Sequence, residues 1–149
     1  MTTPVDLIKR LHQHRAWVNE NLLTAAGRFS DEQQRKVFAI GQGSVWKSLL
    51  HLYAAEYVWL EALTGNESGV APGDSPGQIP GNQQGPGAIA SLEELQTKWS
   101  ELQNRWNQYL SKLTTESLDE TVSRITFSAG NRVDGGLPRG SLWCRVRRS

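Results

Sequence analysis

The sequence predicts an all-α protein, an up-down helix bundle in which three long helices are clear and a fourth is missing or replaced. Apolar residues recur at steps of three and four in three segments that begin near residues 4, 44 and 91. A threonine or serine, residue types that cap helix N-termini, stands before each segment. At 149 residues the chain suits one domain with a core of its own.

The first predicted helix begins at Pro4 and stops at Gly27. Thr3 can serve as its N-cap, Pro4 fits the first helical position, and Asp6 stands where a capping box has its acid. Glycine at position 27 is a natural C-terminal stop. An apolar stripe follows one side of the helix, formed by Leu7, Leu11, His14, Val18, Leu22 and Ala25. We expect this stripe to be the packing seam of the helix.

The second and third predicted helices are equally well marked. The second starts at Ser44, runs to about Leu63 and is apolar around most of its circumference, as for a central helix of a bundle. The third starts with a capping box of Ser91 and Glu94. Its seam alternates steps of three and four and consists of Leu92, Leu95, Trp99, Leu102, Trp106, Leu110 and Leu113. Such spacing is typical of a helix packed in a bundle.

Residues 64–90, between these two helices, contain a glycine at almost every fourth position and four Pro-Gly pairs. This pattern can hold neither a helix nor a central strand. It predicts a flexible, exposed linker, with a lid over a pocket as the alternative.

The region after the third helix changes character. Residues 121–128 alternate and are rich in β-branched side chains, which predicts a short strand or hairpin with a turn at Gly130 and Asn131. We place a helix-bundle domain at residues 1–134 and an atypical, disordered basic tail at residues 135–149. Without a fourth helix the seams stay partly uncovered, so we expect a homodimer.

Composition narrows the classes of function. The net charge is +1, and basic residues gather only in the tail, which makes nucleic-acid binding an unfavoured reading. Cys144 is the single cysteine, so no disulfide forms within the chain and a reducing compartment is expected. Neither a signal-peptide pattern nor a spanning apolar run is present. We therefore expect a cytoplasmic protein without a membrane partner.

The three histidines are the candidate site residues. His12 and His14 lie about 200° apart around a helix, so they cannot chelate one metal together. We expect His12 to be exposed and His14, within the apolar stripe, to lie in the core. His51 stands on the sparser side of the second helix, where it can be a hydrogen-bonded core histidine or a metal ligand. Positions three and four residues from it carry no usual metal donor, so other ligands must come from other helices.

Two stretches resemble the DinB-like, or YfiT-like, family of metalloproteins: "HRAWVNENLL" in the first helix and "GSVWKSLLHLYAAEYVWLEALTG" across the second. The order of parts also fits, because the late segment "VSRITFSAGNRV" stands where the family has a short strand-like piece before its last helix. Together the resemblance covers residues 4 to 134. It implies a four-helix bundle that holds divalent nickel or zinc through three histidines. One of these ligands corresponds to His51, and the other two belong to an His-x-x-x-His motif on the last helix. Some members of the family are hydrolases or thiol transferases, which implies a small-molecule or thiol substrate.

The chain departs from the family pattern after Asp134. It continues as "GGLPRGSLWCRVRRS", without a histidine, where the family has its histidine helix. We expect that a frameshift or a mispredicted end replaced that helix, and that metal binding is weak or absent. No catalytic residue can be named from the sequence. Two functions stay open: a divalent-metal-dependent hydrolase or thiol transferase with an incomplete site at His51, and a non-catalytic helix-bundle interaction or dimerisation module.

Overall fold

The computed structural model describes residues 1–126 and 142–147, with the backbone alone at Ser123, Thr126 and 142–147. Its elements, in chain order, are α1 (Pro4–Ala26), α2 (Asp31–Arg35), α3 (Val45–Leu63), α4 (Leu92–Ser111), the 3₁₀ turn η1 (Glu116–Asp119), β1 (Thr121–Thr126) and β2 (Leu142–Arg147). Within these residues, none of the helices combines the length and apolar character that crossing a membrane requires.

The all-α prediction is confirmed, and the helix ends follow from local chemistry. Thr3 and Asp6 form the predicted capping box of α1, and Gly27 is its C-cap. Ser44 and Ser91 cap α3 and α4 through their hydroxyl groups. The five-residue helix α2 was not predicted, although Ser30 and Gln33 form a capping box at its start.

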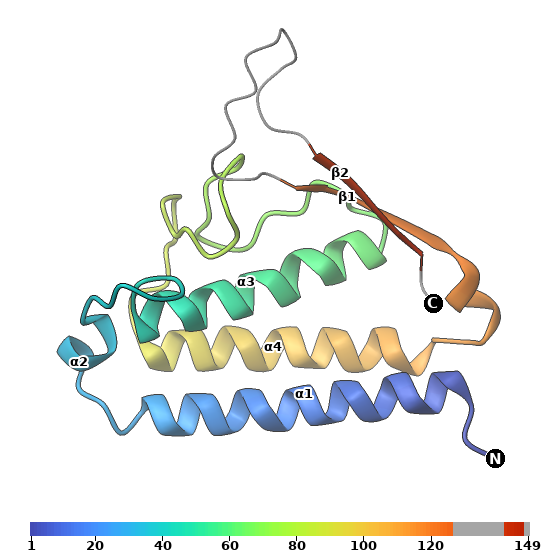
Figure 1. Ribbon diagram of the computed structural model, residues 1–149, viewed down its shortest axis with the longest axis horizontal. Helices are drawn as coiled ribbons and strands as arrows, with labels where there is room; N and C mark the ends of the chain where they lie inside the picture. The colour runs from blue at the N-terminus through green and yellow to red at the C-terminus, as the bar shows by residue number, and fades with distance from the viewer. Residues whose placement is uncertain (127–141, 148–149) are drawn as a thin grey trace, which may run out of the picture.

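The three long helices form a bundle in which α4 packs against both α1 and α3 (Figure 1). Glu56 is hydrogen-bonded to Trp99, and Glu61 to Arg105, so residue numbers increase in the same direction along α3 and α4. These two helices are therefore parallel, whereas α1 runs opposite to both, as Figure 1 shows. The connectivity thus differs in this detail from a simple up-down order, and residues 64–90 return along α3 to the start of α4.

The core lies where α3 and α4 meet. The predicted seam of α4 is buried from Leu95 to Leu110, and it packs against Trp46, Leu49, Leu50 and Tyr53 of α3. Burial of this apolar surface is the main stabilising term of the bundle.

The seam predicted for α1 does not enter this core. Its members Leu7, Leu11 and Leu22 are exposed, and so is His14. The side of α1 that faces α4 instead presents Asn19 and half-buried Arg15. The expectation that the α1 stripe and His14 pack in the core is therefore wrong. Polar pairing, described below, sets the rotation of this helix.

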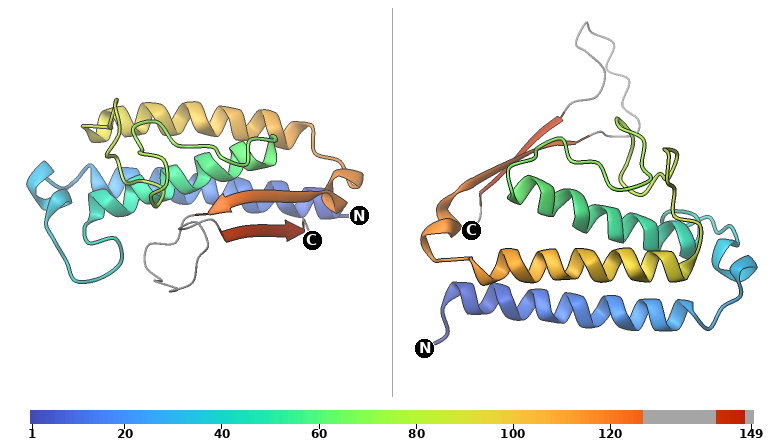
Figure 2. Two further views of the ribbon diagram at one scale, coloured as in Figure 1. Left: turned by 90° about the horizontal axis from the view of Figure 1, so that it is seen from above. Right: turned by 180° about the vertical axis from the view of Figure 1, so that it is seen from behind.

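Residues 64–90 are a packed loop rather than an exposed linker. Ala71 and Ile89 are buried in the main core, and the loop lies along α3 (Figure 2). Glycine and proline exclude helix and central strand here, as predicted, but side-chain hydrogen bonds replace the missing regular ones. Full exposure is thus not what the structure shows at Ala71 and Ile89, whereas the predicted flexibility of the segment stays a prediction.

A two-stranded antiparallel sheet stands beside α3. β1 pairs with β2 in a register that places Thr121 opposite Arg147 and Thr126 opposite Leu142. The strand predicted near residues 121–128 is confirmed for 121–126. The predicted turn at Gly130 and Asn131 lies outside the described residues, as does the rest of the tail apart from β2. Within the tail, the backbone of residues 142–147 pairs with β1 as an antiparallel strand. The disorder expected of the tail stays a prediction.

Candidate functional site: His51 and the loop over α3

His51 is the sequence-predicted site residue, and it lies half-buried in the middle of α3 beneath the loop. Its Nδ1 is 2.7 Å from the carbonyl oxygen of Pro80. Because a carbonyl oxygen only accepts hydrogen bonds, Nδ1 must carry the proton and donate it. In the tautomer with the proton on Nδ1, the lone pair lies on Nε2, the arrangement that suits a metal ligand or a proton acceptor.

The loop backbone comes unusually close to α3 beside this histidine. A Cβ at Gly81 would lie 2.6 Å from both the Cα and the backbone nitrogen of His51. Gly81 also has a φ of 85°, in the left-handed region that favours glycine. No larger residue fits this position without moving the loop away from the helix.

Asp74 organises the turn that presents the Pro80 carbonyl. Its buried carboxylate accepts the backbone N–H of Gly81 at 2.6 Å and that of Gln83 at 2.9 Å. The side-chain amide nitrogen of Gln83 donates to the same carboxylate, and the amide oxygen of Gln83 accepts the N–H of Ile89. These bonds satisfy a buried charge with dipoles of the loop itself, so they fix the loop conformation.

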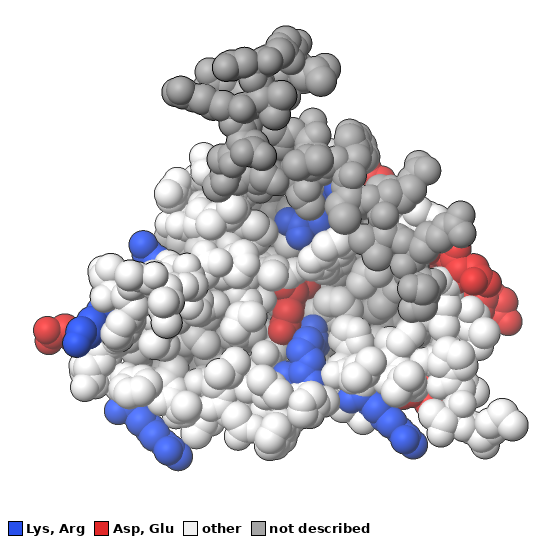
Figure 3. Space-filling model, in the orientation of Figure 1, with Lys and Arg blue, Asp and Glu red and all other residues white. Residues whose placement is uncertain are grey.

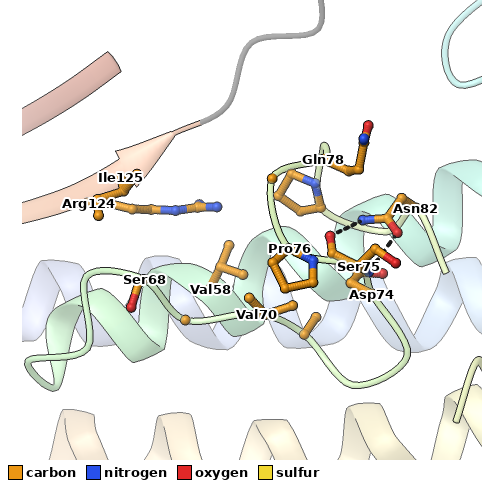
Figure 4. A pocket seen from close by; sticks show the side chains of 14 residues that line it. Val58, Ser68, Val70, Asp74, Ser75, Pro76, Gln78, Asn82, Arg124 and Ile125 are labelled. Carbon is orange, nitrogen blue, oxygen red and sulfur yellow. Dashed lines mark hydrogen bonds between the residues drawn. The ribbon is translucent and has the colours of Figure 1, made fainter. Parts of the chain in front are cut away.

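A small cavity lies between the loop and β1 (Figure 4). Its walls include Val58, Val70 and Pro76, and Arg124 extends across it from β1 toward the loop. Arg124 is only 9% exposed, and its guanidinium carbon lies 5.4 Å from the ring centre of Trp59. The cavity volume of about 30 Å³ has room for about two water molecules. It does not hold a substrate in this conformation.

The described residues do not fit a metal centre around His51. No group of three or more His, Cys, Asp or Glu side chains that could hold a metal ion occurs among them. His12 packs on Trp106 of α4, and His14 stacks on Trp17 on the outer side of α1. The structure therefore brings no second histidine to His51, and His51 as a metal ligand stays a prediction.

A buried polar cluster between the helices was missed by the sequence analysis. Glu56 of α3 accepts hydrogen bonds from Asn19 at 2.7 Å and from Trp99 at 3.0 Å. It also forms an ion pair with Arg15, at 3.1 Å. Burial lowers the pKa of the Arg15 guanidinium, and the nearby Glu56 carboxylate opposes that shift. The partners of Glu56 come from two other helices, α1 and α4, so no spacing rule within one segment could have found this cluster.

His12 is half-buried between α1 and α4, contrary to the prediction that it is exposed. Its ring centre lies 4.7 Å from that of Trp106. Burial lowers its pKa to about 4, with a smaller contribution from the charge of Arg15. Its Nδ1 and the Nε1 of Trp106 are both buried without a hydrogen-bond partner in the described part of the chain. His12 is therefore neutral at physiological pH and packs as an aromatic side chain.

Comparison with known proteins adds one finding. A sequence model of the DinB superfamily matches residues 12–135, which include α3, the loop and β1. No curated protein and no solved structure matches the chain.

Proposed function

The chain belongs to the DinB superfamily, and we propose that within this superfamily it is a non-catalytic helical interaction module. We propose that it forms a homodimer through α1. The observation that carries the proposal is the exposed apolar stripe of that helix. Leu7, Leu11 and Leu22 face outward on α1, with Leu11 60% exposed. Apolar side chains exposed along one side of a helix support an interaction site there.

The spacing of the stripe suits packing against another helix. Its steps are four, three, four, four and three residues from Leu7 to Ala25, as in the seam of a helical bundle. The stripe also matches itself in antiparallel register about a point between residues 14 and 15. Leu7 then faces Leu22 of the second copy, and Leu11 faces Val18. A surface that is complementary to itself is what a two-fold symmetric dimer requires.

The available area agrees with a modest dimer interface. α1 has 23 residues, about 34 Å of helix. A face of that length and about 10 Å width supplies roughly half of the ~800 Å² that a stable interface buries on each partner. Further apolar surface lies beyond the C-terminal end of α1, in the segment between α2 and α3, where Val37, Phe38 and Ile40 are exposed. In Figure 3, much of the visible surface over α1 is neither acidic nor basic, and basic side chains project from its lower edge.

The competing function is that of a divalent-metal-dependent hydrolase or thiol transferase. The superfamily is generally associated with metal. Among the described residues only His51 corresponds to a ligand, and no set of three ligands surrounds it. We therefore rank the interaction module first.

Light scattering over a concentration series tests the proposal. We expect a dimer for the natural chain and at least tenfold weaker association for Leu11→Glu, which places a carboxylate in the stripe. Gln13→Glu is the matched control, because it adds the same charge at an exposed α1 position outside the stripe. A natural chain that is monomeric at every concentration would contradict the proposal, as would equal effects of the two variants.

A further inference from the structure

We propose that His51 is the latch that holds the loop of residues 71–89 on α3, and that this chain uses the histidine in that role rather than as a metal ligand. The proposal rests on three features of the described residues: the hydrogen bond from His51 to Pro80, the close approach of Gly81 to the helix, and the Asp74 carboxylate that fixes the turn between them. It does not depend on the proposed dimer.

The hydrogen bond is the only one described between a side chain of α3 and the middle of this loop. Pro80 offers its carbonyl oxygen, 2.7 Å from Nδ1 of His51, to a side chain that is half-buried. A loop carbonyl without this donor would face the helix surface with no protein partner. Loss of a buried or half-buried bond of this kind costs more than the bond contributes, because the acceptor stays desolvated.

The fit of the loop at the next residue makes the bond specific. Gly81 lies so close to the backbone of Leu50 and His51 that a Cβ there would overlap both residues. The carboxylate of Asp74 accepts the N–H of Gly81 at 2.6 Å. The Pro80 carbonyl is thus presented to position 51 by backbone that has little freedom to shift. The geometry requires a donor at the place of Nδ1, and an imidazole supplies it.

The described residues support the latch and do not support a metal centre. A metal site needs about three protein ligands that converge, whereas no such group surrounds His51 within the described residues. The latch needs one donor and one acceptor, and both are present at hydrogen-bond distance.

Three substitutions at position 51 separate the two roles. The amide nitrogen of asparagine lies close to the place of Nδ1, whereas that of glutamine lies close to the place of Nε2. His51→Asn therefore keeps the latch donor and loses the imidazole, His51→Gln displaces the donor, and His51→Ala removes it. The readout is amide hydrogen exchange at Gly81, Gln83 and Gly85, whose N–H groups are all bonded within the loop.

We expect exchange at these amides to be about five- to tenfold faster in His51→Ala and His51→Gln, as loss of one hydrogen bond predicts. In His51→Asn it should remain within about twofold of the natural chain. Amides in the middle of α4 serve as the internal control and should not change. Equal exchange in all four proteins would overturn the proposal, as would an asparagine variant that behaves like the alanine variant.

Titration with Zn²⁺ and Ni²⁺ forms the second arm. The latch predicts no stoichiometric binding that depends on position 51. One metal ion bound per natural chain, and lost in both His51→Ala and His51→Asn, would overturn the proposal in favour of a ligand role. This result is independent of the oligomeric state, so failure of the latch and failure of the dimer can be told apart.

Discussion

Helices α1 and α4 carry similar apolar stripes in sequence and opposite environments in the structure. The stripe of α4 lies in the core, where Leu102 is 2% exposed, whereas Leu11 in the stripe of α1 is 60% exposed. Both helices have the same spacing of three and four residues and similar caps. Periodicity therefore specifies a helix and its apolar side, but not the surface against which that side packs.

The polar residues of α1 explain the difference. Arg15 and Asn19 both reach Glu56 of α3, whose carboxylate is mostly buried. A buried carboxylate requires partners, because unpaired it would be strongly destabilising. Rotating α1 to bury its leucines would withdraw both partners from Glu56. The helix therefore presents a mixed inner side, on which Arg15 and Asn19 lie between apolar residues such as Ile8 and Leu23, and its predicted stripe stays outward.

The largest expected effect is the difference in stability loss between a leucine truncated on α4 and one truncated on α1. Leu102→Ala should lower the free energy of unfolding by about 3 kcal/mol, because it removes packed apolar surface and leaves a cavity. Leu11→Ala should lower it by less than about 0.5 kcal/mol in the monomer. Urea unfolding at low protein concentration measures both. Similar losses in the two variants would show that α1 buries its stripe in solution.

Glu56→Gln should have the next largest effect, about 2 kcal/mol in urea unfolding. The substitution leaves the partly buried charge of Arg15 without its counter-ion. The surface pair of Asp31 and Arg35 provides a control, because Asp31→Asn should change stability by less than about 0.5 kcal/mol. If Arg15→Gln does not restore part of the loss in the double variant, the pair does not set the rotation of α1.

The two histidines of α1 give a smaller, pH-dependent effect. The folded pKa of His12 is about 4, below its ordinary value of 6.5, so the native state binds fewer protons than the unfolded state between these values. Stability should thus be constant above about pH 6.5 and fall by about 1 to 2 kcal/mol toward pH 4, after allowance for partial exposure. His12→Gln should flatten this dependence, measured by thermal unfolding from pH 4 to 8. His14→Gln, on the outer face, should leave it unchanged; the reverse pattern would contradict the described orientation of α1.

The sequence predicts the parts of the fold that local chemistry determines. Caps such as Thr3 and Ser91 and the spacing of apolar residues define the helix ends, because both act within a few residues. The partners of His51 and Glu56 could not be predicted, since Pro80 and Arg15 are 29 and 41 positions away in the chain. No spacing rule links them.

For the loop, too, the sequence predicts only part of the structure. Glycine and proline correctly exclude a helix in residues 64–90, yet the order of the loop comes from the carboxylate of Asp74 and the amide of Gln83. Such bonds leave no periodic trace in the sequence. The resemblance to the DinB-like family identified His51 as a notable residue, and the structure adds its hydrogen bond to the carbonyl oxygen of Pro80.

Cross-linking across the proposed two-fold axis tests the outward stripe of α1 most directly. In a Cys144→Ser background, which removes the single natural cysteine, His14→Cys would place one thiol of each copy beside the axis. A short bismaleimide should then convert most of the protein to a covalent dimer, while Gln13→Cys, which points away from the axis, should stay mainly monomeric. Equal and low yields from the two variants at a concentration where light scattering reports a dimer would contradict pairing through α1.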